Sequence, residues 1–366
     1  MLKSRYNTLN TTYSFMLDFI FGLFSKDIGI DLGTVNTLVY IKGRGIVINE
    51  PSVVAINEKT NQILAVGKEA KKMVGRTPGH IVAIRPLRHG VVSDFEVTEK
   101  MLKYFFDKVQ SEFSAFLPNR PRVVVGVPLG GTEVEKRAVV QASKNAGARQ
   151  VFLVEEPMAA AIGVKLPISE PSGNFIIDIG GGTAEIAVIS LGGIVISRSV
   201  RYAGDKLNED IVNYIRDEFK MAIGERTAED VKISIGSVID SGESKDIIVK
   251  GRNLVTGLPQ EILIKEKHIR EAIKDSVENL ILAVEETIEK TPPELVADLM
   301  SKGLIMTGGG SLLGGLAEYV SERMGVPVKV AEDPLTAVVR GASIVLEDID
   351  KLSGVLVDSF SEKAPQ

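Results

Sequence analysis

Short apolar runs and longer amphipathic stretches alternate along most of this chain. The apolar runs are rich in Val and Ile and are bounded by Gly, Asp or Pro, as buried strands are. In the amphipathic stretches, apolar residues recur with the period of a helix that buries one face. The pattern predicts strands and turns within residues 27–66, 122–128, 151–154, 175–189, 238–265 and 303–307. It predicts helices at residues 68–76, 97–110, 132–146, 206–221 and 267–290. Further helices are predicted to start after residue 155, from residue 291 and from Leu312. Another is predicted near residue 224, with Thr227 as its N-cap. This order of strands and helices predicts an α/β fold.

Two strand–turn–strand segments, at residues 27–41 and 175–189, follow the same plan. Each has an apolar strand with an Asp near its end, a Gly/Thr turn and a second apolar strand. Glycine permits a tight turn and leaves no Cβ between the backbone N–H groups and a phosphate oxygen. Two such turns suit one nucleotide polyphosphate with its metal ion. The repetition favours this interpretation over two ordinary hairpins that contain turn residues.

Polar side chains at the two turns match the chemistry of a metal-bound polyphosphate. Thr34, Asn36 and Thr183 can bond phosphate oxygens. Asp31 and Asp178 can hold the waters of a Mg²⁺ ion, which keeps much of its hydration shell in proteins. The sequence therefore predicts metal contacts through water at these two carboxylates.

Hydrolysis of a terminal phosphate requires a positioned water more than covalent help from the protein. Glu156, at a helix start marked by Pro157, is the candidate to orient or deprotonate that water, and Thr183 can hold it from the opposite turn. As an alternative, Glu155 and Glu156 form a charge pair that interacts favourably with the helix dipole.

A third glycine turn, formed by Gly308, Gly309 and Gly310, follows an apolar strand. We expect it to let adenosine pack flat against the backbone, since the spacing of a Rossmann fingerprint fails and the chain has no Walker A loop. Glu229 and Lys232, three positions apart on one helix face, are candidates to receive the ribose or adenine edge. They can equally form a surface ion pair.

Composition narrows the class of protein. A chain of 366 residues is long enough for two to three domains. The net charge of −5 argues against a nucleic-acid binder. The absence of cysteine excludes disulfides and thiolate metal sites, and a cytoplasmic location is expected.

An apolar segment near the N-terminus is too short to span a bilayer. Asp18, Gly22, Ser25 and Lys26 would share one face of a helix there. The other face would carry the large apolar residues, namely Met16, Leu17, Phe19, Ile20, Phe21, Leu23 and Phe24. This pattern is typical of a helix lying in a membrane interface, although a helix packed on the protein's own core remains the alternative. Phe116 and Leu117, in a later loop, are a second candidate membrane contact or a pair tucked under that loop. Met16 is also a plausible start, which would make residues 1–15 dispensable.

Together these residues resemble the actin, sugar-kinase and DnaK-type chaperone superfamily, and within it the bacterial actins of the MreB family. The resemblance runs from about Lys26 to about Asp350. It rests on the segments DIGIDLGT (27–34), NEPSVVAI (49–56), AIRPLR (83–88), EEPMAAAIG (155–163), DIGGGT (178–183), AIGERTAE (222–229) and LIMTGGGSL (304–312).

The resemblance implies an actin-like α/β fold of two ribonuclease-H-like domains, each with a smaller inserted subdomain, and Mg-ATP in the central cleft. Residues 1–25 would form a tail and an amphipathic membrane helix. Domain I would comprise residues 26–170 and 343–366, with an insertion at about 58–90. Domain II would comprise residues 171–342, with an insertion at about 208–270. The resemblance places the phosphates at Gly33, Thr34, Val35, Asn36, Gly180, Gly181, Gly182 and Thr183. It places metal-linked waters at Asp31 and Asp178, the attacking water near Glu156 and Thr183, and the nucleoside at Glu229, Lys232 and Gly308 to Gly310.

Members of this family assemble with ATP into paired filaments on the inner face of the cytoplasmic membrane. Those filaments guide sidewall peptidoglycan synthesis and maintain the rod shape of the cell. The resemblance therefore implies a slow ATPase whose partners are other copies of itself, membrane lipids, MreC and RodZ. One alternative is a small-molecule kinase of the same fold, although we see no inserted substrate module. A chaperone ATPase is the other, and it would require a peptide-binding domain where the chain stops at Gln366.

Overall fold

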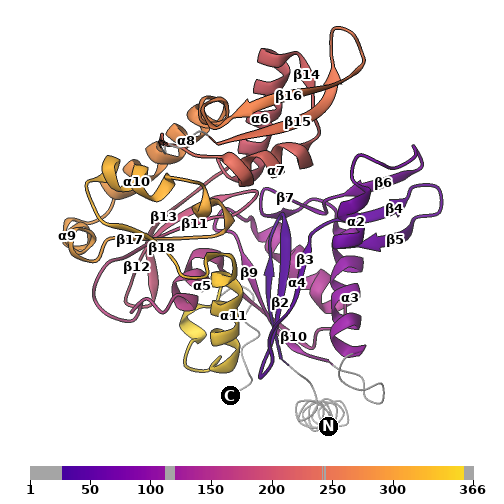
Figure 1. The fold of residues 1–366 in the computed structure, drawn as a ribbon. Coiled ribbons are helices and arrows are strands. Elements are labelled where there is room, and N and C mark those ends of the chain that lie inside the picture. Colours follow the sequence, from indigo (N-terminus) through magenta and orange to yellow (C-terminus); the bar gives the residue numbers. More distant parts are fainter. Residues whose placement is uncertain (1–26, 112–119, 241, 243–244, 358–366) are drawn as a thin grey trace, which may run out of the picture.

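Two five-stranded sheets lie on either side of a central pair of helices (Figure 1). The structure is a computed structural model that describes residues 27–111, 120–240, 242 and 245–357. Two smaller three-stranded sheets, labelled β4–β6 and β14–β16, lie toward one end of the molecule.

The first large sheet has the strand order β10-β9-β1-β2-β3. Its strands are β1 (Ile28–Leu32), β2 (Asn36–Ile41), β3 (Gly45–Pro51), β9 (Arg122–Val127) and β10 (Gln150–Glu155). Strands β1, β2 and β3 form an antiparallel meander, while β1, β9 and β10 run parallel. Strands β9 and β10 are nearly continuous apolar runs because such parallel strands are covered on both faces.

The second large sheet has the same connectivity, with the order β13-β12-β11-β17-β18. Its strands are β11 (Asn174–Ile179), β12 (Ala184–Ser190), β13 (Gly193–Val200), β17 (Leu304–Thr307) and β18 (Val328–Val330). Here β11, β12 and β13 form the antiparallel meander, and β11, β17 and β18 run parallel. The two hairpins that repeat in the sequence therefore occupy equivalent places in two related sheets.

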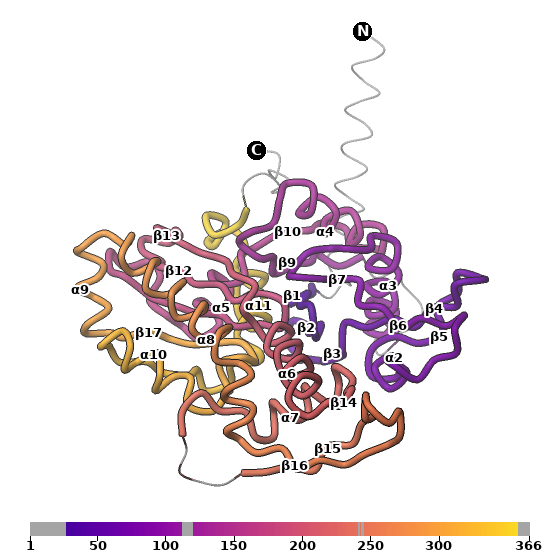
Figure 2. Tube along the Cα trace, turned by 90° about the horizontal axis from the view of Figure 1, so that it is seen from above, coloured from indigo at the N-terminus to yellow at the C-terminus, as the bar shows by residue number. Residues whose placement is uncertain are grey.

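Helices α5 (Glu156–Gly163) and α11 (Ala337–Glu347) lie between the two large sheets, as both ribbon and tube views show (Figure 1; Figure 2). Helix α11 packs on α5, β1 and β9, and α5 packs on β11 and β12. Their side chains form one apolar core with residues of both sheets, including Val124 and Ile176. Residues 337–342, placed in domain II by the expected boundaries, thus belong to a helix that packs on the first sheet.

Longer helices complete the cores of the two halves. They are α3 (Phe95–Ser111) and α4 (Glu133–Asn145) in the first half, and α8 (Glu266–Glu289), α9 (Pro293–Lys302) and α10 (Leu316–Met324) in the second. The predicted helix at residues 132–146 is confirmed: Thr132 is its N-cap, and it forms a capping box with Glu135. The predicted helices at residues 97–110 and 267–290 are confirmed as α3 and α8.

Each half also carries a small sheet. In the first half it comprises β4 (Val54–Asn57), β5 (Gln62–Val66) and β6 (Ile81–Ile84), with helix α2 (Lys68–Met73) packed on it. In the second half it comprises β14 (Met221–Ala222), β15 (Asp246–Asn253) and β16 (Pro259–Lys265), with helices α6 (Gly204–Phe219) and α7 (Glu225–Ile235) beside it. A short hairpin of β7 (Leu87–Arg88) and β8 (Val91–Val92) follows the first small sheet.

Two predicted helix starts are wrong. Helix α7 begins at Glu225 with Gly224 as N-cap, so Thr227 lies inside the first turn. An N-cap needs an extended backbone, which Gly224 has. No helix starts at Leu312: a 3-10 turn covers Gly309–Leu312, and α10 begins at Leu316. The left-handed Gly315, with φ of 70°, separates the two elements.

Candidate functional site

The first glycine turn (residues 33–35, between β1 and β2) and the second glycine turn (residues 180–183, between β11 and β12) lie directly against each other. A Cβ atom at Gly182 would lie 2.6 Å from Thr34 Oγ1. A Cβ atom at Gly181 would overlap the side chain of Val35. The structure thus brings together the two turns that the repeated pattern assigned to one ligand.

A third segment, the β7–β8 turn, closes on the same place. The Gly90 N–H donates a hydrogen bond of 2.9 Å to Thr34 Oγ1. His89 has a φ of 51°, and its Cα would lie 2.9 Å from a Cβ at Gly182. Sequence reasoning did not select this turn, although a His-Gly pair with two positive φ angles is ordinary turn chemistry.

The two metal-linked candidates lie at equivalent positions in the two sheets. Asp31 is on β1, directly before Leu32 at the strand end, and Asp178 is on β11, directly before Ile179. The hydroxyl of Thr307 donates a 2.7 Å hydrogen bond to Asp178 Oδ1. Burial, reinforced by the charge of Asp178, raises the pKa of Asp31 to about 7, and burial raises the pKa of Asp178 to about 6.

Glu156 and Glu185 complete a group of four carboxyls between the halves. Glu156 opens α5, is 8% exposed, and has a pKa raised well above the usual value by burial and by the charges of Glu185, Asp31 and Asp178. Glu155 is the N-cap residue of α5 and Glu156 is its first residue, so both lie at the helix start, as the alternative of a charge pair near the helix dipole expects. Glu185 lies on β12 with no exposed surface, and burial raises its pKa to about 8. Sequence reasoning missed it, because a single Glu in an apolar strand has no local signal.

The four carboxyls have no compensating cation within the described part of the chain. No ion pair among the described residues involves Asp31, Glu156, Asp178 or Glu185. A buried carboxylate without a cationic partner is costly, so such a group favours a bound cation or bound protons. No set of three or more His, Asp or Glu side chains in the described ranges is placed to hold a metal ion directly.

The nucleoside candidates lie on α7, beside the second glycine turn. Lys232 Nζ donates a 2.7 Å hydrogen bond to the carbonyl of Gly204, whose own N–H bonds the carbonyl of Gly180. Burial lowers the pKa of Lys232. Glu229 forms a 2.8 Å ion pair with Lys71 of α2, so it bridges to the other half and does not simply pair with Lys232.

The third glycine turn also borders this region. Gly308 has a φ of 77°, and a Cβ there or at Gly310 would overlap Ile179, which precedes the second glycine turn. Strand β17 runs parallel to β11 and delivers the third turn to the same sheet edge as Asp178. The three glycine turns therefore follow the carboxyl ends of β1, β11 and β17, which are the strand ends where α/β proteins bind ligands.

The predicted membrane residues lie outside the described part of the chain. These are Met16, Leu17, Phe19, Ile20, Phe21, Leu23, Phe24, Phe116 and Leu117. Among the described residues, no helix has both the length and the apolar character that crossing a membrane requires.

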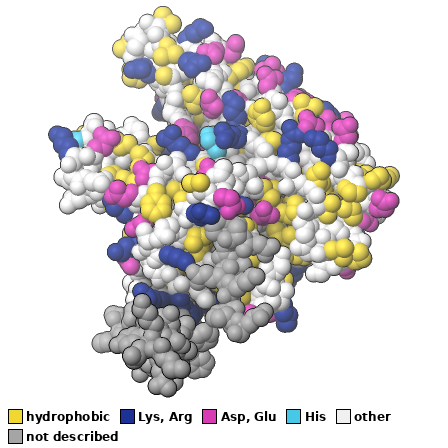
Figure 3. Space-filling model, turned by 180° about the vertical axis from the view of Figure 1, so that it is seen from behind, with side chains coloured by type: hydrophobic (Ala, Val, Ile, Leu, Met, Phe, Trp, Pro, Cys, Tyr) yellow, Lys and Arg dark blue, Asp and Glu magenta, His cyan; other side chains and the backbone are white. Residues whose placement is uncertain are grey.

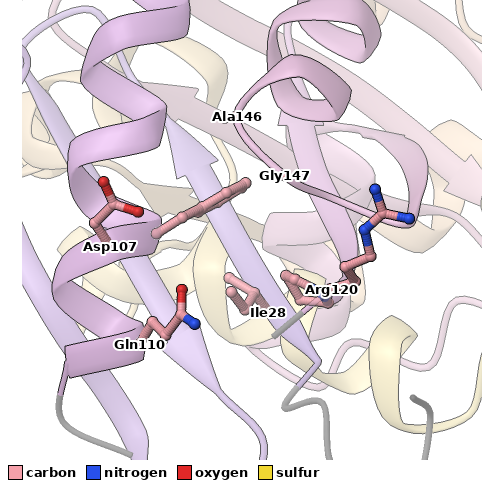
Figure 4. A pocket seen from close by; sticks show the side chains of 8 residues that line it. Ile28, Asp107, Gln110, Arg120, Ala146 and Gly147 are labelled. Atoms are coloured by element: carbon pink, nitrogen blue, oxygen red, sulfur yellow. The ribbon is translucent and has the colours of Figure 1, made fainter. Parts of the chain in front are cut away.

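A pocket of about 200 Å³ lies away from these turns (Figure 4). Ile28 and Phe106 line it together with Asp107, Gln110 and Arg120. Because Ile28 begins β1, this pocket lies at the amino end of the parallel strands, opposite the edge that carries Asp31. It contains none of the predicted nucleotide residues.

A family profile and two cell shape-determining proteins match most of this chain. A family profile described as MreB/Mbl protein matches residues 25–354. The cell shape-determining protein Mbl of Bacillus subtilis is 49% identical over 330 residues, covering 90% of this chain and 98% of Mbl. The cell shape-determining protein MreB of Escherichia coli is 51% identical over 346 residues, covering 93% of this chain and 98% of MreB.

Solved structures show the same relationship. MreB5 of Spiroplasma citri bound to ADP superposes with a TM-score of 0.85 at 40% identity, covering 89% of this chain and 98% of that one. The MamK double helical filament gives a TM-score of 0.73 at 25% identity, covering 88% and 99%. The chain has the actin-like fold of these proteins and belongs to the MreB/Mbl family.

Proposed function

We propose that this protein binds ATP with Mg²⁺ between its two halves, hydrolyses it slowly, and assembles into filaments that determine cell shape. The observation that carries the proposal is the contact of the two glycine turns, Gly182 against Thr34, beside four carboxyls without cationic partners among the described residues, of which Glu156, Asp178 and Glu185 are buried. MreB5 of Spiroplasma citri has been solved with ADP and with AMPPNP, which supports the binding of an adenine nucleotide by this chain.

The residues fit a polyphosphate and a hydrated Mg²⁺ ion. Gly33 in the first glycine turn, and Gly181 and Gly182 in the second, carry no Cβ that would stand between a backbone N–H and a phosphate oxygen. Asp31 and Asp178 would hold metal-bound waters. Because burial raises the pKa of each carboxyl, a nearby cation would favour the ionised forms. When bound, Mg²⁺ supplies neutralisation of phosphate charge. Glu229, Lys232 and Gly308 to Gly310 would contact the nucleoside.

For hydrolysis, Glu156 would orient the attacking water and accept its proton. Its raised pKa makes it a stronger base than an ordinary carboxylate once it is ionised. Thr183, 8% exposed in the second glycine turn, would hold the same water through its hydroxyl. Positioning rather than covalent chemistry would then limit the rate, consistent with a slow ATPase.

Assembly is proposed from the relatives. MamK forms a double helical filament, and the Mbl and MreB relatives are cell shape-determining proteins. We extend this to paired filaments of this chain on the inner face of the cytoplasmic membrane, held there by Met16–Phe24 and Phe116–Leu117. Through MreC and RodZ these filaments would direct sidewall peptidoglycan synthesis and keep the cell rod-shaped. Nucleic acid is not an expected partner, and acidic and basic side chains are interspersed on the face shown in Figure 3.

The test uses the full purified chain with vesicles that contain anionic lipid. With Mg-ATP we expect the protein to sediment with the vesicles and to form paired filaments by electron microscopy. Asp178→Ala should weaken Mg²⁺-dependent ATP binding and reduce filament yield. Binding of ATP without any assembly would contradict the filament proposal, and indifference of the protein to adenine nucleotides would contradict the site.

A further inference from the structure

Glu185 is the one member of the four-carboxyl group for which the proposed function names no role. It lies on β12, two residues after Thr183 and directly across the ladder from Asp178. It has no exposed surface. A carboxylate buried so completely needs a structural reason, because its desolvation must be offset by hydrogen bonds.

The hydrogen bonds of Glu185 connect the two halves of the molecule. The N–H of Leu129 lies 3.1 Å from Oε1 and 3.1 Å from Oε2 of Glu185. The hydroxyl of Ser199, on β13 of the same sheet as Glu185, donates to Oε1 over 3.1 Å. Leu129 follows β9 of the first sheet. The Glu185 side chain therefore connects a loop of the first half with the antiparallel meander of the second half.

That loop borders the proposed hydrolytic residues. Pro128, next to Leu129, would lie 2.9 Å from a Cβ at Gly90, and Thr183 Cγ2 would lie 3.5 Å from the same atom. On the strand that leads into the loop, a Cβ at Gly126 would lie 3.6 Å from Glu156 Cγ. The segment 126–129 therefore runs from Glu156 toward Thr183 and is held at its far end by Glu185.

We propose that Glu185 is a positioning residue of the hydrolytic site. By accepting the hydrogen bond of the Leu129 amide, it holds the 126–129 segment between the two halves and so keeps Thr183 opposite Glu156. This inference rests on the proposed ATP hydrolysis. The hydrogen bonds of Glu185 go to the Leu129 amide and the Ser199 hydroxyl, so its role is to hold the loop and not to transfer a proton.

The experiment compares Glu185→Ala and Glu185→Gln with Ser199→Ala, a control that leaves the Leu129 contact in place. Three readouts are measured: Kd for a fluorescent ATP analogue, kcat for phosphate release, and hydrogen exchange at the Leu129 amide. Glu185→Ala should lose protection at Leu129 and reduce kcat by roughly 10- to 100-fold with little change in Kd, as a misplaced reacting group does. Glu185→Gln keeps one carbonyl acceptor and should keep kcat within about threefold of the unmodified protein.

Several results would overturn the proposal. Equal loss of kcat in the Gln and Ala variants would indicate proton transfer by Glu185, and unchanged kcat in the Ala variant would remove the role altogether. If Glu185→Ala does not fold, Glu185→Gln decides: a lower kcat without faster exchange at Leu129 contradicts positioning through that amide. If the unmodified protein does not hydrolyse ATP, the proposed function fails instead, while exchange at Leu129 still tests whether Glu185 holds the loop.

Discussion

At the scale of single residues, Gly181 and Gly182 must be glycine because the first glycine turn packs against them, and not because of their own backbone angles. Neither has a positive φ. A side chain at either position would collide with Val35 or Thr34 of the first glycine turn. The sequence pattern selected these residues for phosphate binding, and the structure adds that the same absence of Cβ lets the two halves meet.

Glu156→Gln tests the proposed base. The amide keeps the shape of the side chain but accepts a proton poorly, so phosphate release should slow by roughly 10²–10⁴-fold while ATP binding is retained. The measurement is single-turnover phosphate release beside a direct binding titration. Glu155→Gln, the adjacent and half-buried carboxyl, is the matched control and should hydrolyse ATP normally. Unchanged release in Glu156→Gln would reject the assignment.

The raised pKa of Asp31 makes the nucleotide-free protein sensitive to pH. Burial raises this pKa from the ordinary 3.8 to about 7, so between about pH 4 and pH 7 the folded chain binds more protons than the unfolded chain. This contribution to the free energy of unfolding is full below about pH 4 and is lost as the pH rises toward 7. Asp31→Asn removes the titrating group, so the fall in Tm from pH 5.5 to pH 7.5 should be smaller than in the unmodified protein. Identical pH profiles of Tm for the two proteins would contradict the pKa shift.

At the scale of elements, the close packing of α5 on α11 joins the two sheets. A Cβ at Gly163 would overlap the carbonyl of Ala337, and a Cβ at Gly341 would overlap the carbonyl of Ala159. The backbones of α5 and α11 thus lie in direct contact, and each position requires glycine because the other helix leaves no room for a Cβ. The sequence analysis did not select α11, although its pattern is amphipathic like that of α3, with Arg340 and Glu347 outside the buried face.

Gly341→Ala tests this packing. The added methyl group forces the helices apart, and we expect a loss of about 1–3 kcal/mol in the free energy of unfolding, as overpacked cores show. Chemical denaturation of the nucleotide-free protein measures it. Gly354→Ala is the control, since a Cβ there meets nothing within 4 Å. Equal stability of the two variants would mean that the helices adjust freely.

At the scale of the whole molecule, ion pairs join the two halves beside the small sheets. Lys71 pairs with Glu229 at 2.8 Å, and Arg85 pairs with Glu225 at 2.7 Å and with Asp205 at 3.3 Å. Each cation belongs to the first half and each carboxylate to the second. Because Glu229 is also a nucleoside candidate, we expect the ion pair that it forms with Lys71 to influence nucleotide release.

Lys71→Ala should accelerate dissociation of a fluorescent ATP analogue by roughly twofold to fivefold, since partly exposed ion pairs contribute little individually. Raised salt should accelerate dissociation in the unmodified protein and less in the variant. Lys72→Ala is the control, because Lys72 pairs with Glu69 on its own helix. Equal dissociation rates in both variants would mean that the Lys71 ion pair does not influence nucleotide release.

Much of the fold and of the candidate site was predictable from short-range pattern. The strands, the three glycine turns and the strand-end residues Asp31 and Asp178 depend on local rules of propensity, turn chemistry and periodicity. The start of α10 was not predictable in this way, because the left-handed Gly315 interrupts a pattern that continues to look helical. Nor was the N-cap of α7, since Thr and Gly have similar N-cap preferences and both Gly224 and Thr227 lie near the start of this helix.

The sequence by itself determined which backbone turns form and which groups they present, because those depend on neighbouring residues along the chain. Only the tertiary structure decided which groups meet. Glu185 and Leu129 are 56 positions apart, and Lys71 and Glu229 are 158 apart, so no local pattern records either contact. The physical reason is that burial and charge at such points depend on how two separately formed sheets pack around α5 and α11.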